Sequence, residues 1–249
     1  MSIRVAVLGA KGRMGAEACK AISETKDLEL VAQIDIGDSL DLLVSSAAQV
    51  VVDFTHPDAV MKNLEFAINN GINVVVGTTG FDEAKLAQIK SWLANHSKVG
   101  ALIAPNFGLG AVLMMQFAAK ASKYFDSVEI IELHHPNKAD APSGTATRTA
   151  EMITDARRSV KKAAMPDATS SAIDGARGAL VGEVPVHSVR LRGLVAHQEV
   201  ILGDLGETLT IRHDSIDRTG FMPGVLLGIR SVVSHSGLTY GLEHFMDLN

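Results

Sequence analysis

One segment gathers most of the side chains that could perform acid–base chemistry. Over residues 129–146 the chain reads EIIELHHPNKADAPSGTA, which places His134, His135 and Lys138 close together in sequence. Two prolines stiffen this loop, which then enters a Ser-Gly-Thr triplet at the start of an expected helix. Either hydroxyl of the triplet could cap the helix, whose free N–H groups could hold a carboxylate. The segment therefore predicts a cationic pocket for a small, multiply charged anionic substrate.

A metal site is the alternative interpretation of the two adjacent histidines. Neighbouring residues on a strand point to opposite faces, and no third ligand follows at ordinary spacing. We therefore expect no metal. For each histidine taken singly, a surface loop with solvated charges remains the alternative.

A second motif could bind the phosphates of a dinucleotide. Gly9-Ala10-Lys11-Gly12-Arg13-Met14-Gly15 follows the first apolar run and opens a helical pattern. A tight glycine turn before a helix N-terminus presents backbone N–H groups, and the helix dipole favours a pyrophosphate. Asp35 lies twenty residues after Gly15, where a carboxylate accepts hydrogen bonds from ribose hydroxyls. The spacing differs from the commoner G-x-G-x-x-G, so an ordinary glycine-rich turn is the alternative.

The charges around this loop bear on the choice of cofactor. Asp35 would repel a 2′-phosphate, whereas Lys11 and Arg13 could neutralise one. We therefore expect the chain to accept both NADH and NADPH. The alternative is that both cations are merely solvated.

The first 107 residues predict the sheet that must position this loop. Short runs that are apolar on both faces alternate with helical patterns, which is typical of a parallel sheet covered on both sides. Right-handed crossovers then give a doubly wound, Rossmann-like α/β fold. The expected strands are Val5–Leu8, Leu28–Ile34, Val50–Phe54, Val74–Val76 and Ala101–Ala104, and the expected helices are Met14–Ser23, Pro57–Asn70 and Asp82–His96, with a weak short segment around Leu40–Ser46.

The pattern changes after a helix near Ala111–Tyr124 and predicts a second, α+β domain. Residues 161–182 lack periodicity and predict a long functional or subunit-contact loop. Helical spacing returns between Phe221 and Val233, which suggests that the tail packs back on the first domain. The expected strands are Val128–Leu133, Val184–Arg190, Glu199–Leu202 and Glu207–Arg212, and close spacing favours antiparallel pairing among the last three.

Composition excludes several classes of protein. The 249 residues are 47% hydrophobic and 20% charged, which excludes intrinsic disorder. A net charge of −5 gives no general attraction to nucleic acid or anionic membrane. No apolar run reaches the about 18 residues of a membrane span, and the N-terminal run is too short for a secretion signal. The single cysteine, Cys19, fits a reducing compartment, so we expect a cytoplasmic protein.

Residues 129–146 resemble the signature of the dihydrodipicolinate reductase family. The pattern E-[IV]-x-E-x-H-x-x-x-K-x-D-x-P-S-G-T-A has every specified position filled. The resemblance covers essentially the whole chain, and the G-x-x-G-x-x-G spacing is the family's own form. It includes Gly77-Thr78-Thr79-Gly80, Ala104-Pro105-Asn106-Phe107 and Asp217-Arg218.

The resemblance implies NAD(P)H-dependent reduction of the cyclic imine 4-hydroxy-tetrahydrodipicolinate to tetrahydrodipicolinate, in diaminopimelate and lysine biosynthesis. His134 matches the family's proton donor/acceptor and Lys138 its proton donor. Hydride delivery to an imine carbon develops negative charge on nitrogen, so a positioned acid accelerates it; the sequence does not separate the two roles. The resemblance assigns substrate binding to His135, Gly144 and Thr145 beside the possible cap Ser143, and cofactor contacts to Gly9, Ala10, Lys11, Gly12, Arg13, Met14, Asp35, Gly77, Thr78, Thr79, Ala104, Pro105, Asn106 and Phe107.

The resemblance also implies a homotetramer assembled through the sheets of the second domain. We expect residues 1–108 and 218–249 to bind the dinucleotide, and residues 109–217 to bind substrate and mediate tetramerisation. Hinge motion near residues 107–110 and 216–220 would close the site and exclude water. There are two alternatives. The first is a cofactor-binding sensor without catalytic activity, which the intact set of acid–base residues argues against. The second is a dehydrogenase that acts on another amino-acid-derived imine, which the complete signature argues against.

Overall fold

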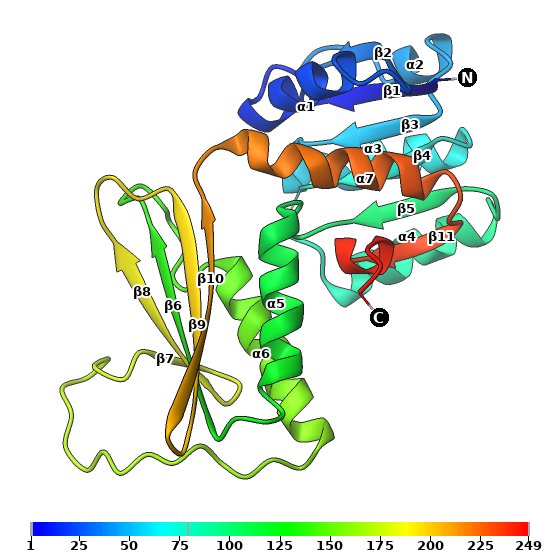
Figure 1. The fold of residues 1–249 in the computed structure, drawn as a ribbon. Helices are drawn as coiled ribbons and strands as arrows, with labels where there is room; N and C mark the ends of the chain where they lie inside the picture. Colours follow the sequence, from blue (N-terminus) through cyan, green and yellow to red (C-terminus); the bar gives the residue numbers. More distant parts are fainter. Residues whose placement is uncertain (1, 79, 249) are drawn as a thin grey trace. The chain divides into compact units, whose positions relative to one another are not determined.

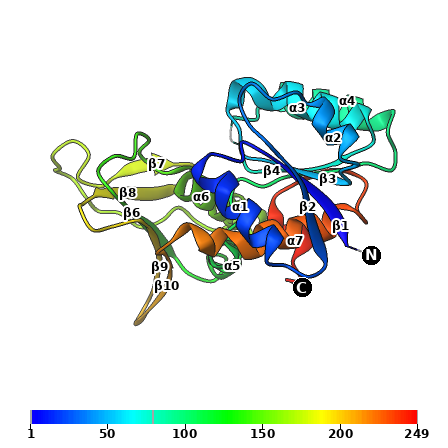
Figure 2. The same ribbon diagram turned by 90° about the horizontal axis from the view of Figure 1, so that it is seen from above.

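The computed structural model describes residues 2–78 and 80–248, and the chain divides into two compact units. The first unit comprises Met1–Leu109 together with Arg218–Asn249, and the second comprises Gly110–Asp217. Figures 1 and 2 show the elements of each unit in two views. Among the described residues, no helix is long and apolar enough to cross a membrane.

The first unit is built on a six-stranded sheet in which every neighbouring pair is parallel. The strand order is β11-β5-β4-β3-β1-β2, so the order reverses at β1, which lies between β2 and β3. Ligands of doubly wound sheets bind at the carboxyl ends of the strands, at this reversal. The expected Rossmann-like fold is confirmed. The strands are β1 (Ile3–Leu8), β2 (Leu28–Ile34), β3 (Val50–Asp53), β4 (Asn73–Val76), β5 (Gly100–Ile103) and β11 (Gly237–Tyr240).

Helices cover both faces of this sheet, which explains why its strands are apolar on both sides. Figure 2 shows α1 and α7 on one face and α3 and α4 on the other. Helix α7 lies so close to the sheet that a Cβ on Gly228 would come within 2.8 Å of the Leu102 side chain. The helices are α1 (Arg13–Ser23), α2 (Asp41–Ser45), α3 (Pro57–Asn69), α4 (Glu83–Ala94) and α7 (Met222–Val232), with 3-10 turns η1 (Arg218–Phe221) and η2 (Leu242–Phe245).

The second unit carries a mixed five-stranded sheet in the order β10-β9-β6-β8-β7. Strand β6 is central, and its buried residues Val128, Ile130 and Glu132 alternate with partly exposed ones. Helix α6 packs on β6 and β8 through a face that includes Ala150 and Ile153. The elements are α5 (Leu109–Ala121), β6 (Ser127–His134), α6 (Gly144–Ser159), β7 (Ala179–Val181), β8 (Val184–Arg190), β9 (Ala196–Asp204) and β10 (Glu207–Ser215).

The expected pairing in this sheet is correct for β9 and β10 and wrong for β8. Strands β9 and β10 are antiparallel neighbours, but β8 lies on the far edge of β6 and runs parallel to it. The chain passes from β6 through α6 into the edge strand β7, and β7 and β8 form an antiparallel hairpin, which leaves β8 parallel to β6. Strand β6 pairs with β9 over its whole length and with β8 from Ile130 onward.

Two short strands were not predicted from the sequence. Strand β7 has three residues within the expected loop 161–182, and β11 has four residues beyond α7. Neither is long enough to show a period. The prediction that the tail packs on the first domain is confirmed, since α7 packs against β4 and β5 and β11 pairs with β5.

Candidate functional site

The glycine loop after β1 is shaped by a very close approach between the chain and helix α1. Gly9 adopts a φ of +74°, which favours glycine, and its carbonyl accepts the N–H of Gly12 at 3.0 Å. A Cβ on Gly15 would lie 2.0 Å from the Gly9 carbonyl oxygen, and one on Gly9 would lie 2.7 Å from the Phe54 carbonyl oxygen. The first and last glycines of G-x-x-G-x-x-G are therefore required by packing.

The loop leaves the positive end of α1 open. Gly12 is the N-cap and supplies no side chain to the first turn, which contains no acidic residue. The first N–H groups of a helix have no partner within it, so they are available to an anion. Lys11, Gly12 and Arg13 are exposed, Met14 is half-buried and Ala10 is buried. These residues fit a bound pyrophosphate.

Asp35 closes the same loop from the end of β2. Its Oδ2 accepts the N–H of Lys11 at 2.7 Å and its Oδ1 accepts the N–H of Ile36 at 2.8 Å. The Ile36 and Lys11 hydrogen bonds hold the pKa of Asp35 below its ordinary value, so the group is a carboxylate at neutral pH. The fold thus joins two positions that the sequence analysis paired by spacing alone.

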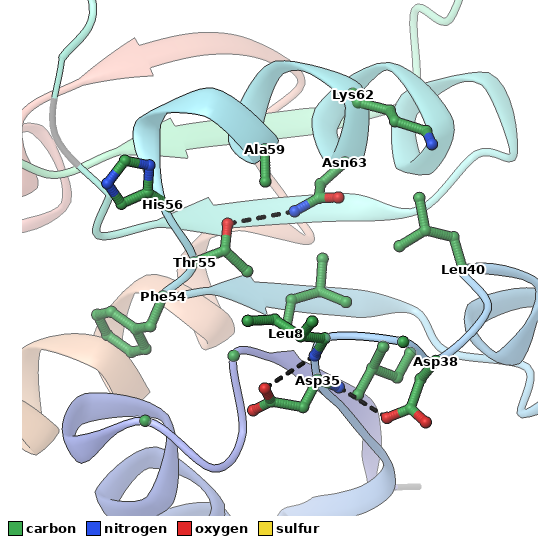
Figure 3. A pocket seen from close by; sticks show the side chains of 15 residues that line it. Leu8, Asp35, Asp38, Leu40, Phe54, Thr55, His56, Ala59, Lys62 and Asn63 are labelled. Atoms are coloured by element: carbon green, nitrogen blue, oxygen red, sulfur yellow. Dashed lines mark hydrogen bonds between the residues drawn. The ribbon is translucent and has the colours of Figure 1, made fainter.

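A cavity of about 520 Å³ opens beside Asp35 at the carboxyl ends of β1, β2 and β3 (Figure 3). Asp35 and Asp38 lie on one side, and residues of α3, including Lys62 and Asn63, lie on the other. The apolar part of the cavity wall is formed by Leu8, Ile34, Leu40, Phe54 and Ala59. The mixture of apolar wall and flanking carboxylates suits the adenosine half of a dinucleotide.

Asp53 organises the next part of this sheet edge, and the sequence analysis gave it no role. Its side chain is 1% exposed and accepts hydrogen bonds from the N–H and hydroxyl of Thr55, the amide of Asn63 and the hydroxyl of Thr78. These bonds tie the ends of β3 and β4 to helix α3. The available signal was a carboxylate closing the apolar run VVVD, because an ionisable group there must find partners.

Gly77 and Thr78 follow β4 directly. A Cβ on Gly77 would lie 2.2 Å from the Phe54 ring, so glycine makes room for this aromatic side chain. Phe54 in turn meets Phe107 edge-on, with ring centroids 5.9 Å apart. Thr79, the third expected contact in this loop, lies outside the described residues.

The segment after β5 lies beside the Gly77–Thr78 segment that follows β4. The Ala104 N–H donates to the Val76 carbonyl at 2.9 Å, and the Gly108 N–H donates to Asn106 Oδ1 at 2.7 Å. Ala104 and Phe107 are buried, whereas Pro105 is exposed. The expected cofactor contacts from both segments therefore meet at one edge of the sheet, except for the undescribed threonine.

In the second unit, β6 places His134 next to an ion pair whose glutamate is buried and whose arginine is partly exposed. Glu132 has no exposed side-chain surface, and its two oxygens accept hydrogen bonds from both terminal nitrogens of Arg190 at 2.8 Å. Glu132 Oε2 also lies 2.5 Å from His134 Nδ1. Sequence reasoning placed Glu132 in the family pattern but missed Arg190, which comes from β8.

The electrostatics of this group favour an ionised glutamate and a neutral histidine. Burial alone would raise the pKa of Glu132, but hydrogen bonds from Arg190, Ser188 and His134 outweigh it and hold the pKa below its ordinary value. Burial lowers the pKa of His134, and the positive charges of Lys138 and Arg190 act in the same direction against the raising effect of Glu132. Near pH 7 His134 is therefore an uncharged imidazole.

Lys138 lies in the loop that follows. Its Nζ is 2.7 Å from Asp140 Oδ1, and its side chain is about a fifth exposed. Burial would raise the pKa of Asp140, but the hydrogen bond from Lys138 outweighs it and keeps the pKa low. His135 is exposed just beyond the end of β6. The loop thus presents one ammonium group and one imidazole near its surface.

Helix α6 begins where this loop ends. Ser143 is buried, and its Oγ accepts the N–H of Ala146 at 3.2 Å as the N-cap. Gly144 is exposed, and its N–H donates a hydrogen bond to the Asp140 carboxylate, which helps to keep the pKa of Asp140 low. Thr145 is half-buried beside Gly144. The helix N-terminus therefore already binds one carboxylate, that of Asp140, as the positive end of a helix dipole favours.

Comparison with known families matches both units of the chain. The family described as "Dihydrodipicolinate reductase, N-terminus" matches residues 3–107, and "Dihydrodipicolinate reductase, C-terminus" matches residues 110–246. Together they span nearly all of the chain.

Individual relatives agree with these matches. The 4-hydroxy-tetrahydrodipicolinate reductase of Corynebacterium efficiens is 61% identical over 248 residues and 100% of both chains. That of Streptomyces avermitilis is 61% identical over 247 residues and 99% of both chains. A solved structure of dipicolinate-bound dihydrodipicolinate reductase from Paenisporosarcina sp. TG-14 has a TM-score of 0.87 and 41% identity, covering 99% of this chain and 100% of that one.

Proposed function

The chain belongs to the dihydrodipicolinate reductase family, and from this premise we propose that it reduces the cyclic imine 4-hydroxy-tetrahydrodipicolinate to tetrahydrodipicolinate. The reaction consumes one NAD(P)H and one proton and releases one water. The observation that carries the proposal is residues 129–146, which fold as a strand, a loop that carries His135 and Lys138, and a helix N-terminus that binds a carboxylate. This chain is accordingly an oxidoreductase of diaminopimelate and lysine biosynthesis.

The first unit fits a pyridine nucleotide. A reduced nicotinamide, when bound, supplies the hydride. The open N-terminus of α1, behind Gly9–Met14, would hold the pyrophosphate, and Asp35 would accept hydrogen bonds from the adenosine ribose. Gly77–Thr79 and Ala104–Phe107 follow β4 and β5, whose carboxyl ends would border the nicotinamide half.

We propose that both NADH and NADPH are used. The Asp35 carboxylate already accepts two backbone N–H groups, which offset part of its negative charge. Lys11 and Arg13 are exposed next to it and would neutralise a 2′-phosphate. The expected values of kcat/KM for the two cofactors lie within about tenfold, or roughly 1.4 kcal/mol.

The second unit supplies the substrate site. One carboxylate of the dianionic substrate would take the place of the Asp140 carboxylate at the start of α6, beside Gly144 and Thr145, with Ser143 capping the helix. Lys138 would add positive charge beside it, and the His135 ring could form a hydrogen bond there. The same donors would hold dipicolinate, the dicarboxylate bound by the relative from Paenisporosarcina sp. TG-14.

Lys138 and His134 are the proposed catalytic residues. Loss of the 4-hydroxyl group as water leaves a C=C bond conjugated with the ring C=N. Hydride then adds to carbon 4, electrons move through the conjugated bonds onto the ring nitrogen, and the enamine formed there isomerises to the ring imine of the product. A positioned acid that protonates the nitrogen lowers the barrier, typically by about 10²–10⁴-fold in rate. An ammonium group can donate this proton and also attract the dicarboxylate, and Lys138 is the ammonium that lies in the loop before α6. His134 lies at the end of β6, where the same loop begins, and would also contact the substrate.

The proposal includes a homotetramer in the cytoplasm. The family resemblance supports both, and strand β10 supports the first because six of its nine residues are exposed in the isolated chain. Light scattering of the purified protein gives the mass directly. A mass corresponding to one chain would reject the tetramer.

One assay tests the reaction. The condensation product of pyruvate and aspartate semialdehyde is generated in place, and loss of NADH or NADPH absorbance is followed after the protein is added. We expect oxidation of both cofactors that depends on the condensation product. Oxidation at the same slow rate with and without that product would reject the proposed function.

A further inference from the structure

We propose that the ion pair between buried Glu132 and partly exposed Arg190 fixes the proton of His134 on Nδ1, so that His134 acts through Nε2 as an acceptor and Lys138 alone donates the proton. The inference rests on the proposed function and deepens it. Glu132 and Arg190 are positioning residues, because they act through His134 and through the loop that carries Lys138.

The position of the proton follows from the contact between Glu132 and His134. Glu132 Oε2 lies 2.5 Å from His134 Nδ1, which is hydrogen-bond distance. An ionised carboxylate has only acceptor sites, so the hydrogen in this bond belongs to the ring nitrogen. A neutral imidazole carries one N–H, and its second nitrogen then has a lone pair. His134 Nε2 is therefore an acceptor and has no proton to give.

Burial of the imidazole is the main reason that this contact does not charge the histidine, and Arg190 acts in the same direction. A lone buried carboxylate would favour the imidazolium form, but Arg190 donates to both oxygens of Glu132 at 2.8 Å. Three charged groups face His134: Glu132 on its own strand, Arg190 on β8 and Lys138 in the loop. Two of the three are cations, which agrees with the lowered pKa of His134.

The same pair also anchors the catalytic loop at two further points. Arg190 Nη2 donates to the Asp140 carbonyl at 2.6 Å, and Glu132 Oε1 accepts the N–H of Ser143 at 3.2 Å. Asp140 is the residue whose carboxylate contacts Lys138. One ion pair therefore holds the beginning, the middle and the end of the segment that runs from His134 to the start of α6.

The chain contains a matched control on the same strand. Glu129, three residues before Glu132, contacts Arg177 at 2.6 Å and His187 at 2.7 Å. This cluster therefore contains the same three residue types, but Glu129 lies on the opposite face of β6 from Glu132. Replacing Glu129 changes an equivalent cluster away from the proposed site.

The experiment compares the wild type, E132Q and E129Q, labelled with ¹⁵N in the histidine rings. Solid-state ¹⁵N spectra distinguish the two neutral tautomers, and the His134 signals are assigned by their loss in a His134→Asn sample. We expect His134 to be the Nδ1–H tautomer in the wild type and in E129Q. In E132Q an amide can also donate to Nδ1, so we expect a mixture of tautomers, while kcat falls by about 100-fold and the KM for NADH is unchanged.

A second variant separates positioning from a structural role. E132Q leaves Arg190 without its anion, so it could lose activity through folding alone. The double variant E132Q/R190M carries no unpaired buried charge, and such replacements are commonly tolerated. We expect it to fold and bind NADH like the wild type and still to have a low kcat.

Three results decide the matter. Unchanged His134 signals in E132Q, or wild-type kcat in the folded double variant, would overturn the proposal. Mixed tautomers together with low kcat in both variants would support it. If the wild type fails to reduce the cyclic imine, the proposed function falls, while the tautomer of His134 still shows whether Glu132 fixes its proton.

Discussion

Replacing Lys138 by methionine should abolish most of the activity while leaving the fold in place. The variant keeps the length of the side chain and removes the ammonium that contacts Asp140 at 2.7 Å. Loss of a general acid costs about 10²–10⁴-fold in rate, which is roughly 3 to 5 kcal/mol in the activation free energy. The pair is partly exposed, with Asp140 56% accessible, so its loss should cost no more than about 1 kcal/mol of stability.

The difference between these two magnitudes makes the test decisive. Steady-state kcat, the dissociation constant for NADH and a urea unfolding curve are measured for Lys138→Met and for Lys123→Met, an exposed lysine of the same unit. We expect kcat to fall at least 100-fold only in the first variant, with NADH affinity and unfolding midpoint near those of the wild type. A Lys138→Met enzyme with kcat within a few-fold of the wild type would remove Lys138 from the acid role.

Three further predictions concern the cofactor loop and the histidine. Gly15→Ala should weaken NADH binding by more than about tenfold, because its Cβ would lie 2.0 Å from the Gly9 carbonyl oxygen; titration by fluorescence measures this, and unchanged affinity contradicts the packing argument. Replacing Lys11 and Arg13 together by alanine should lower kcat/KM for NADPH more than for NADH, whereas equal losses would show that neither cation meets a 2′-phosphate. Burial lowers the pKa of His134, so the unfolded chain binds the proton more tightly and the free energy of unfolding should decrease as the pH falls below 6.5; His134→Asn should reduce this slope, and parallel slopes would contradict the lowered pKa.

Spacing along the chain was enough to predict the dinucleotide loop. Gly9, Gly15 and Asp35 are local signals, since each marks a turn, a close approach or a strand end within one strand–helix–strand unit. The structure supplies the reasons, namely a Cβ that would meet a carbonyl and a carboxylate that accepts the N–H of Lys11. Which cofactor residues act in turnover stays a prediction.

The partner of Glu132 could not be predicted in the same way. Arg190 is 58 residues away in sequence, and it meets Glu132 only because β8 pairs parallel with β6, in the register that sets Arg190 opposite His134. Strand β8 reaches that position through α6 and the edge strand β7, whereas close spacing had favoured pairing β8 with β9. An error in strand order therefore hides the residue that neutralises the carboxylate beside His134.

The two Glu–Arg–His clusters of β6 show why residue types alone do not determine function. Glu129 is 34% exposed, so water and salt screen its contacts with Arg177 and His187 and each can break at little cost. Glu132 has no exposed surface, so it must keep a cation and hydrogen-bond donors at all times. A buried ion pair is seldom the most stable filling for its space, since apolar side chains of similar volume often stabilise as much. The position of the Glu132–Arg190 pair against His134 is therefore better explained by control of a proton than by stability. High salt should weaken the contacts of Glu129 with Arg177 and His187 and leave those of Glu132 intact.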